Sequence, residues 1–180
     1  MNIVIVGATS GIGRALYELY IGEGHTLGIV GRRAGVLEEM CRNHPQRTLG
    51  MTADVADCTA GAAAIDALQQ RMGNLDLIVV CAGTGNLNPE LDFGKELPTL
   101  QTNVTGWTAL VDAAYLLFER QGHGHLVTVT SVGGLRGEPG APAYSASKAY
   151  QINYTEALRK KAFKSGLPVF VTDIRPGFVD

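Results

Sequence analysis

Short apolar runs alternate with longer segments of helical periodicity along the whole chain. The runs are continuous rather than alternating with polar residues, which is typical of strands in a parallel sheet covered on both faces. The alternation of strands and helices along the chain predicts right-handed crossovers. It hence predicts a doubly wound α/β sheet, or Rossmann fold. The expected strands span 3–6, 26–30, 48–52, 75–81, 125–130 and 168–174, and the expected helices span about 12–22, 34–44, 57–72, 97–121 and 143–165.

Length and composition restrict the class of protein. The 180 residues fit one domain, 1–180, because domains usually hold about 100–200 residues. A net charge of −2 without a basic run argues against nucleic acid or an anionic membrane as a partner. The apolar runs are well short of the ~20 residues of a transmembrane helix. Three cysteines without metal-ligand spacing favour the reducing cytoplasm and no metal site.

A glycine-rich turn joins the first expected strand to the first expected helix. It reads Gly7-Ala8-Thr9-Ser10-Gly11-Ile12-Gly13. Glycines permit a positive φ and let backbone N–H groups approach a pyrophosphate, which the start of a helix also attracts. The spacing differs from the common G-x-G-x-x-G fingerprint, so a helix-start turn with packing glycines is the alternative interpretation.

The end of the second expected strand bears on the choice between the two nicotinamide dinucleotides. An NAD site usually carries an acidic residue there, whereas an NADP site carries a basic group for the 2′-phosphate. This chain reads Val30-Gly31-Arg32-Arg33, and its next carboxylate is Glu38. Because arginine binds phosphate through two hydrogen bonds, the pair favours NADP(H) over NAD(H). Two ordinary surface charges are the alternative.

Three polar residues follow the pattern of an acid–base site. Tyr144 and Lys148 stand four residues apart in an expected helix, so both side chains lie on one face. A phenol, with an ordinary pKa near 10, acts as an acid near neutrality only if its anion is stabilised, and a nearby ammonium supplies that stabilisation. Ser131 follows an expected strand, where its hydroxyl could bond a substrate oxygen. The Tyr-x-x-x-Lys pair alone is weak evidence, since such pairs are common on solvated helices.

Asn103 interrupts the apolar stripe of the helix expected at 97–121. A buried amide is costly unless it is hydrogen-bonded. Asn103 is therefore either a satisfied structural residue or part of a site.

Together these motifs resemble the short-chain dehydrogenase/reductase superfamily, and its classical type in particular. The matching pieces follow the family order over essentially all 180 residues: Gly7–Gly13, Asp54-Val55, Ala82-Gly83, Asn103-Val104-Thr105-Gly106, Ser131, Tyr144–Lys148 and Pro176-Gly177. Val6 stands where a threonine is common, and Val80-Cys81 stands where the family usually has two asparagines. Because the sequence stops just after Val179, we expect the family's last strand and substrate lid to be missing.

The resemblance implies hydride transfer between a nicotinamide dinucleotide and a carbonyl or secondary alcohol. Tyr144 would exchange a proton with the substrate oxygen and Ser131 would polarise that oxygen. Lys148 would hold the nicotinamide ribose and stabilise the phenolate, and Asn103 would position a water that links Lys148 to solvent. The implied cofactor-binding residues are Gly7, Thr9, Ser10, Gly11, Ile12, Gly13, Arg32, Arg33, Asp54, Val55, Ala82, Gly83, Tyr144, Lys148, Pro176, Gly177 and Val179.

Two other functions are alternatives at this stage. Without a lid the substrate pocket lacks walls, which favours a dinucleotide-binding module without turnover, or an inactive fragment. A sugar-nucleotide epimerase shares the Tyr-x-x-x-Lys pair but needs a longer substrate domain. The resemblance also implies a homodimer or homotetramer, formed through the outer faces of the helices at 97–121 and 143–165.

Overall fold

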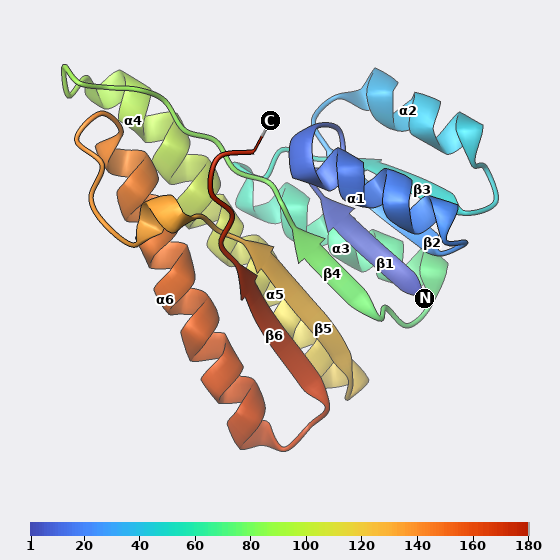
Figure 1. Cartoon of the computed structure of the whole chain (residues 1–180). Coiled ribbons are helices and arrows are strands. Elements are labelled where there is room, and N and C mark those ends of the chain that lie inside the picture. Colours follow the sequence, from blue (N-terminus) through green and yellow to red (C-terminus); the bar gives the residue numbers. More distant parts are fainter. Residues whose placement is uncertain (180) are drawn as a thin grey trace.

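Six short segments form the strands β1 (Asn2–Val6), β2 (Thr26–Gly31), β3 (Thr48–Thr52), β4 (Leu77–Val80), β5 (Gly124–Val129) and β6 (Val169–Ile174). The structure, a computed structural model that describes residues 1–179, pairs them in the order β3-β2-β1-β4-β5-β6 (Figure 1). Every neighbouring pair is parallel. The predicted doubly wound sheet is confirmed, and its strand order reverses between β1 and β4, where open α/β sheets bind ligands.

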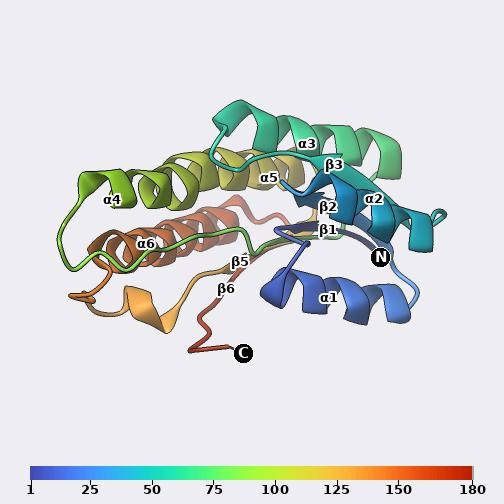
Figure 2. The same ribbon diagram turned by 90° about the horizontal axis from the view of Figure 1, so that it is seen from above.

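The helical segments lie between these strands. They are α1 (Gly11–Gly22), α2 (Ala34–Asn43), α3 (Cys58–Met72), α4 (Phe93–Leu100), the π-helical turn η1 (Gln101–Gly106), α5 (Trp107–Gln121), the 3₁₀ turn η2 (Val132–Gly134) and α6 (Pro142–Ser165). Seen from above, α1 lies on one side of the sheet, and α3 and α5 lie on the other (Figure 2). None of the helices within residues 1–179 has the length and apolar character needed to cross a membrane.

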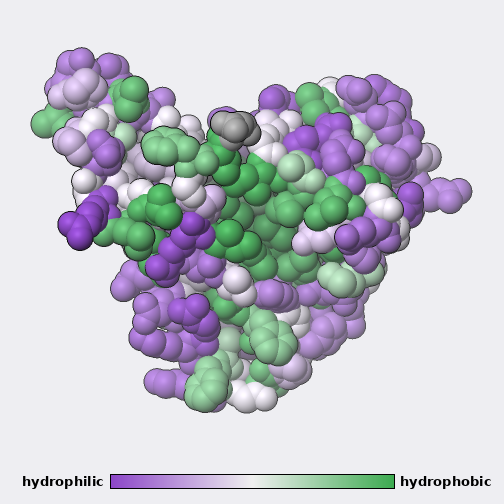
Figure 3. Space-filling model, in the orientation of Figure 1, coloured by the Kyte–Doolittle hydropathy of each residue, from purple (hydrophilic) through white to green (hydrophobic). Residues whose placement is uncertain are grey.

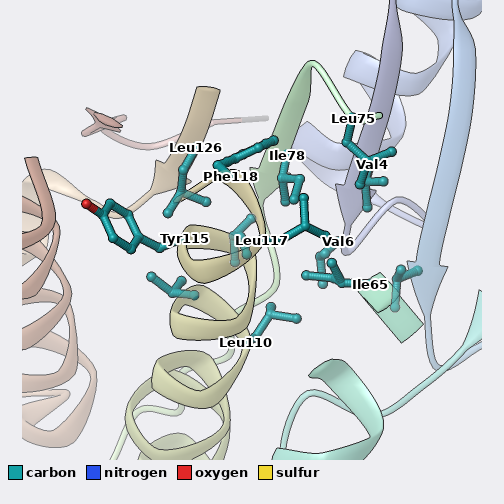
Figure 4. Packing of buried hydrophobic residues seen from close by; sticks show 14 of the residues in the cluster. Val4, Val6, Ile65, Leu75, Ile78, Leu110, Tyr115, Leu117, Phe118 and Leu126 are labelled. Carbon is teal, nitrogen blue, oxygen red and sulfur yellow. The ribbon is translucent and has the colours of Figure 1, made fainter. Parts of the chain in front are cut away.

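Two hydrophobic layers fix the helices to the sheet, because successive strand residues point to opposite faces. The larger layer contains Val4, Val6 and Ile78 of the sheet together with buried residues of α3, α5 and α6 (Figure 4). Ile3 and Ile5 point the other way and pack against α1 and α2. The strands are thus buried on both faces, as their continuous apolar runs predict.

The prediction of a single helix at 97–121 is wrong in its start and in its continuity. The helical region begins earlier, at Phe93, where the Asp92 carboxylate accepts a hydrogen bond of 2.8 Å from Gly94 N. It then widens into the π-helical turn η1 before α5 begins. A Cβ at Gly106 would overlap the Val55 carbonyl, so the turn is pressed against the loop after β3. That contact joins segments far apart in the sequence, so the periodicity of one segment cannot predict it.

The strand predicted at 75–81 is also too long, since β4 spans Leu77–Val80. Leu75 is buried, but its main-chain N–H and C=O groups bond a side chain and not a neighbouring strand. The Gln121 carboxamide accepts from Leu75 N at 2.9 Å and donates to Leu75 O at 2.7 Å. A glutamine at the end of α5 therefore takes the place of a sheet partner.

Candidate active site

A cleft of about 550 Å³ opens at the carboxyl ends of the first four strands. The loops after β1, β2, β3 and β4 supply most of its lining, which consists of Val6, Gly7, Thr9, Ser10, Gly11, Ile12, Gly13, Gly31, Arg32, Arg33, Ala53, Asp54, Val55, Cys81, Ala82, Gly83, Thr84, Thr102 and Val179. Of the residues predicted to bind the cofactor, four are outside this lining in the described part of the chain, namely Tyr144, Lys148, Pro176 and Gly177.

The glycine loop forms one wall through close backbone contacts. Gly7 has a φ of +91°, and a Cβ there would lie 2.8 Å from Ala82 N. A Cβ at Gly13 would overlap the carbonyl oxygen of Gly7. Both positions therefore require glycine, because any side chain would push the loop away from its neighbours.

The start of α1 differs from the starts of α3 and α4. Asp57 caps α3 and Asp92 caps α4 with side-chain oxygens, but among residues 1–179 no side chain caps α1 at Ser10. The first N–H groups of a helix have no partner inside the helix and carry a partial positive charge. Since Gly11 and Ile12 line the cleft, these donors are available to an anion there.

Two arginines stand at the rim of the cleft, beside the end of β2. The Arg33 guanidinium donates two hydrogen bonds to Thr9 Oγ1, of 3.1 Å from Nε and 2.8 Å from Nη2. Arg32 Nη1 lies 3.7 Å from Asp54 Oδ2; the Arg32 side chain is largely exposed and that of Asp54 is about half exposed. Arg32 and Arg33 directly follow Gly31, the last residue of β2. The end of β2 therefore carries positive charge where an NAD site usually has a carboxylate.

Tyr144 and Ser131 meet at one small space beside the cleft. The Tyr144 ring passes between two glycines, because a Cβ at Gly85 would overlap the ring and a Cβ at Gly133 would lie 3.4 Å from its Cε1. The same Gly133 Cβ would lie 3.3 Å from Ser131 Oγ. Ser131 Oγ accepts a hydrogen bond of 3.0 Å from Gly133 N, so its own proton remains for another acceptor.

Two exposed apolar side chains follow Ser131 in the chain. Val132 and Leu135, on the segment that follows β5, are 47% and 58% exposed. Hydrophobic side chains also gather in the middle of the face that carries α1, between α1 and α6 (Figure 3). Apolar walls around a few polar groups are typical of a site for a small organic molecule.

Lys148 lies between the two parts of the site and is buried. Its Nζ is 5.8 Å from the centroid of the Tyr144 ring, and a Cβ at Gly83 in the cleft wall would lie 3.3 Å from it. Burial lowers the pKa of Lys148 to about 8, although Asp173 and Cys81 act in the opposite direction. Burial also raises the pKa of Cys81 to about 12, so this thiol is neutral near pH 7.

Asn103 connects the loop after β4 with the first turns of α6. Its carboxamide accepts from Thr84 N at 2.9 Å and donates to Thr84 O at 2.6 Å and to Ser147 Oγ at 3.0 Å. The expected burial of Asn103 is found, and these partners show a structural role. Its expected role in positioning a water stays a prediction.

The segment after β6 places Pro176 behind Ser131. The Pro176 carbonyl accepts a hydrogen bond of 3.0 Å from Val132 N, at the start of η2. Pro176 and Gly177 therefore lie on the serine side of the site, and Val179 returns to the cleft wall.

Sequence reasoning missed Gln151, Gly85 and Gly133. Gln151 is fully buried, and its carboxamide contacts both Lys148 and Asn103. The two glycines stand in the irregular segments 84–96 and 133–142, whose position after strands is the pattern that could have found them. For Gln151 the pattern is a polar stripe of helical spacing that continues from Tyr144 and Lys148.

The model of the short chain dehydrogenase family matches residues 1–180. The chain belongs to this family. An uncharacterized oxidoreductase of Myxococcus xanthus (strain DK1622) is 37% identical to this short-chain dehydrogenase over 183 residues, which cover 98% of this chain and 71% of the relative. The predicted assignment to the oxidoreductases of this family is thereby confirmed.

Solved structures resemble this short-chain dehydrogenase over almost its whole length. The closed form of serine dehydrogenase complexed with NADP+ has a TM-score of 0.91 and 26% identity, covering 100% of this chain and 73% of that chain. A short chain dehydrogenase/reductase from Burkholderia phymatum in complex with NAD has a TM-score of 0.88 and 27% identity, covering 99% of this chain and 66% of that chain. The family thus binds nicotinamide dinucleotides of both kinds.

Proposed function

We propose that this short-chain dehydrogenase is an NADP(H)-dependent oxidoreductase that interconverts a carbonyl compound and a secondary alcohol, with Tyr144 as general acid/base. The observation that carries the proposal is the meeting of Ser131, Tyr144 and Lys148 beside a glycine-lined cleft. When bound, the nicotinamide supplies or accepts the hydride. We further propose that 1–180 acts as one dinucleotide-binding domain that also holds the catalytic residues.

The residues of the cleft fit a dinucleotide. Gly7 and Gly13 leave room where a Cβ would fill the loop, and the uncapped start of α1 offers N–H donors to a diphosphate. Asp54 and Val55 would hold the adenine, and Ala82 and Gly83 would lie along its ribose. The other proposed cofactor contacts are Thr9, Ser10, Gly11, Ile12, Arg32, Arg33, Tyr144, Lys148, Pro176, Gly177 and Val179.

The three polar groups have separate tasks in the reaction. The Ser131 hydroxyl, whose oxygen already accepts from Gly133 N, donates a hydrogen bond to the substrate oxygen and orients it, while keeping its proton. The Tyr144 hydroxyl gives a proton to that oxygen in reduction and takes it back in oxidation. The Lys148 ammonium stabilises the phenolate and holds the nicotinamide ribose, and Asn103 ties the β4 loop to α6.

NADP(H) is the proposed cofactor because of the charge at the rim. A 2′-phosphate carries negative charge, and Arg32 and Arg33 stand where it would lie. The hydrogen bonds from Arg33 to Thr9 hold this guanidinium at the glycine loop before any ligand binds. Such preorganisation supports phosphate binding, since less side-chain entropy is lost.

Assembly and location complete the proposal. Family resemblance supports a homodimer or homotetramer through the outer faces of α5 and α6, with a small-molecule carbonyl or alcohol as the ligand and neither nucleic acid nor membrane as a partner. The free thiols of Cys41, Cys58 and Cys81 support a reducing, cytoplasmic location.

The test is NADPH oxidation by the purified protein against a panel of aldehydes and ketones. We expect turnover of at least one compound, and a loss of roughly 100- to 1,000-fold in kcat in Tyr144→Phe, which lacks the transferable proton. Binding of NADPH should stay within about threefold of the wild type, because the phenol contributes chiefly to the chemical step.

Tyr150→Phe is the matched control. Tyr150 lies on the same helix, is 36% exposed and contacts Thr108 Oγ1 at 2.8 Å, so its loss should leave kcat unchanged. NADPH binding without turnover of any compound would instead support the module without catalysis. Equal losses in both variants would contradict the role of Tyr144.

A further inference from the structure

Gln151 links Lys148 to the helix that contains Asn103. It lies seven residues after Tyr144 on α6 and is 0% exposed. Its Oε1 accepts a hydrogen bond of 3.0 Å from Lys148 Nζ, and its Nε2 donates one of 2.8 Å to the main-chain oxygen of Asn103. These partners fix the orientation of the carboxamide, because an ammonium only donates and a carbonyl only accepts.

The acceptor on Asn103 belongs to the π-helical turn η1. The i→i+5 pattern of a π turn disturbs the regular ladder of the helix, and such turns often mark functional sites. Gln151 reaches the Asn103 carbonyl across 48 residues of sequence. The Gln151 carboxamide therefore joins this turn to the Lys148 ammonium.

The second contact restricts the direction of the ammonium. Lys148 Nζ has three donors, and two of them are used by Val129 O at 3.3 Å and Gln151 Oε1 at 3.0 Å. Within residues 1–179, the third donor is left for the cleft, on the side of Gly83. Gln151 and Val129 thus hold the ammonium from behind while one N–H faces the cleft.

We propose that Gln151 is a positioning residue, whose neutral carboxamide directs the Lys148 ammonium toward the cleft and keeps it protonated. The proposal rests on the proposed function, since it concerns the same Lys148. An apolar side chain could fill the same volume without the cost of burying a carboxamide. A carboxylate would form an ion pair with the ammonium, and its negative charge would offset the positive charge that acts on Tyr144. The neutral carboxamide orients the ammonium and leaves this positive charge available for Tyr144.

Other charged and titratable groups also face Lys148. Asp173 on β6 has a nearly buried carboxylate that accepts from Thr130 Oγ1 at 2.6 Å and pairs with Arg175. Cys81 follows β4, and the Tyr144 ring lies on the same helix as Lys148. These residues are the same in every Gln151 variant, so a difference between the variants reports the group at position 151.

The experiment measures the protonation of Lys148 directly, by the pH titration of its ¹³Cε NMR signal, assigned with Lys148→Met. In Gln151→Met, which keeps the size, we expect the midpoint to fall by at least about half a pH unit, because the ammonium loses an acceptor. In Gln151→Glu we expect it to rise by a similar amount, because a carboxylate favours the ammonium. Asn153→Met, on the exposed face of α6, should leave the midpoint unchanged.

Kinetics give a second measurement. For Gln151→Met we expect roughly a tenfold loss in kcat/KM at pH 7 and a pH profile displaced in the direction of the NMR midpoint. If no compound is turned over by the wild type, the proposed function fails, while the NMR midpoints still test the contact. If turnover is present but the midpoints agree in all variants, only the positioning role fails.

Folding is monitored by circular dichroism and Tm. Should Gln151→Met fail to fold, Gln151→Glu carries the same test with the opposite sign. Slow solvent exchange of the Gln151 carboxamide protons in the wild type is also expected, because both ends are bonded in the interior. A folded Gln151→Glu protein with an unchanged Lys148 midpoint would overturn the proposal.

Discussion

The two sides of the candidate site are built in different ways. On the cofactor side, the glycine loop and the start of α1 offer backbone N–H groups, and glycines such as Gly13 provide the room. On the catalytic side, buried side chains bond partners on distant elements, for instance the Asn103 side chain with Ser147 Oγ and the Gln151 side chain with the main-chain oxygen of Asn103. The first side depends on the path of one loop, and the second depends on several helices holding their relative places.

This difference predicts how each side fails. A single Cβ at Gly7 or Gly13 collides with main chain, which cannot move without moving the segments packed beside it. A single change in the catalytic network leaves a buried polar group without its partner, which alters protonation and stability while the backbone stays in place.

The largest effect on cofactor binding is expected for Gly13→Ala. The added Cβ would overlap the Gly7 carbonyl, and the cost of such overpacking is about 3 kcal/mol. We expect NADPH to bind roughly 100-fold more weakly or the Tm to fall clearly, as measured by calorimetry. Gly22→Ala at the end of α1 is the control, since a Cβ there meets no other described atom within 4 Å. Equal behaviour of the two variants would remove the argument for a backbone-built wall.

The next effect concerns Lys148 and the dependence of stability on pH. Burial lowers the pKa of Lys148 from its ordinary 10.5 to about 8 in the folded state. Between these values the unfolded chain binds the additional proton, so the free energy of unfolding rises with pH from about 8 to about 10.5. Below about pH 8 the lysine is protonated in both states, and the folded state carries the full cost of burying its charge.

Urea unfolding at pH 7 and at pH 10.5 measures this difference. Relative to Lys148→Met, the wild type should gain on the order of 2–3 kcal/mol of unfolding free energy over this range. Lys160→Met, which replaces a largely exposed lysine of the same helix, should keep the pH dependence of the wild type. A wild-type curve parallel to that of Lys148→Met would show that the ammonium is not desolvated.

The contrast between the two sides also explains what the sequence could predict. The cofactor wall was predictable because its residues, Gly7 to Gly13, are adjacent in the chain and follow a strand. The strands were predictable from continuous apolar runs, and β3 has the predicted bounds. The helix at 97–121 was not, because Pro98 stands inside α4 and the π-helical turn depends on a contact between Gly106 and Val55.

Side-chain partners on the catalytic side were hardest to predict. Asn103 was singled out by its place in an apolar stripe, but its partners Thr84 and Ser147 could not be inferred from periodicity. Gln151 was missed because a polar residue on a helix is usually solvated, although its spacing places it on the helix face of Lys148; its partner on Asn103 could not be inferred from that spacing. Such contacts require the relative positions of two helices, which spacing within one helix does not contain.

A smaller effect is expected for the arginines of the rim. Arg33→Ala removes a guanidinium already held at the glycine loop by Thr9, whereas Arg32→Ala removes one that lies 3.7 Å from Asp54. Because charge-assisted hydrogen bonds contribute about 1.5–3 kcal/mol, we expect the preference for NADPH over NADH to fall roughly tenfold in Arg33→Ala. The ratio of kcat/KM values for the two cofactors measures it. A preference for NADH in the wild type would contradict the proposed cofactor.

The smallest effect is expected for Thr9→Val, which keeps the shape of the side chain and removes the hydroxyl that Arg33 bonds. The guanidinium keeps its charge but loses its fixed position, so NADPH binding should weaken by about threefold and NADH binding should be unchanged. Isothermal titration with both cofactors measures this. In Thr9→Val combined with Arg33→Ala, the loss should not exceed that of Arg33→Ala alone, because the Thr9 hydroxyl acts through the arginine, and valine keeps the other atoms with which Thr9 would contact the cofactor. Additive losses would instead assign the Thr9 hydroxyl a cofactor contact of its own, and the cofactor side would then depend on side chains more than its glycine-lined wall indicates.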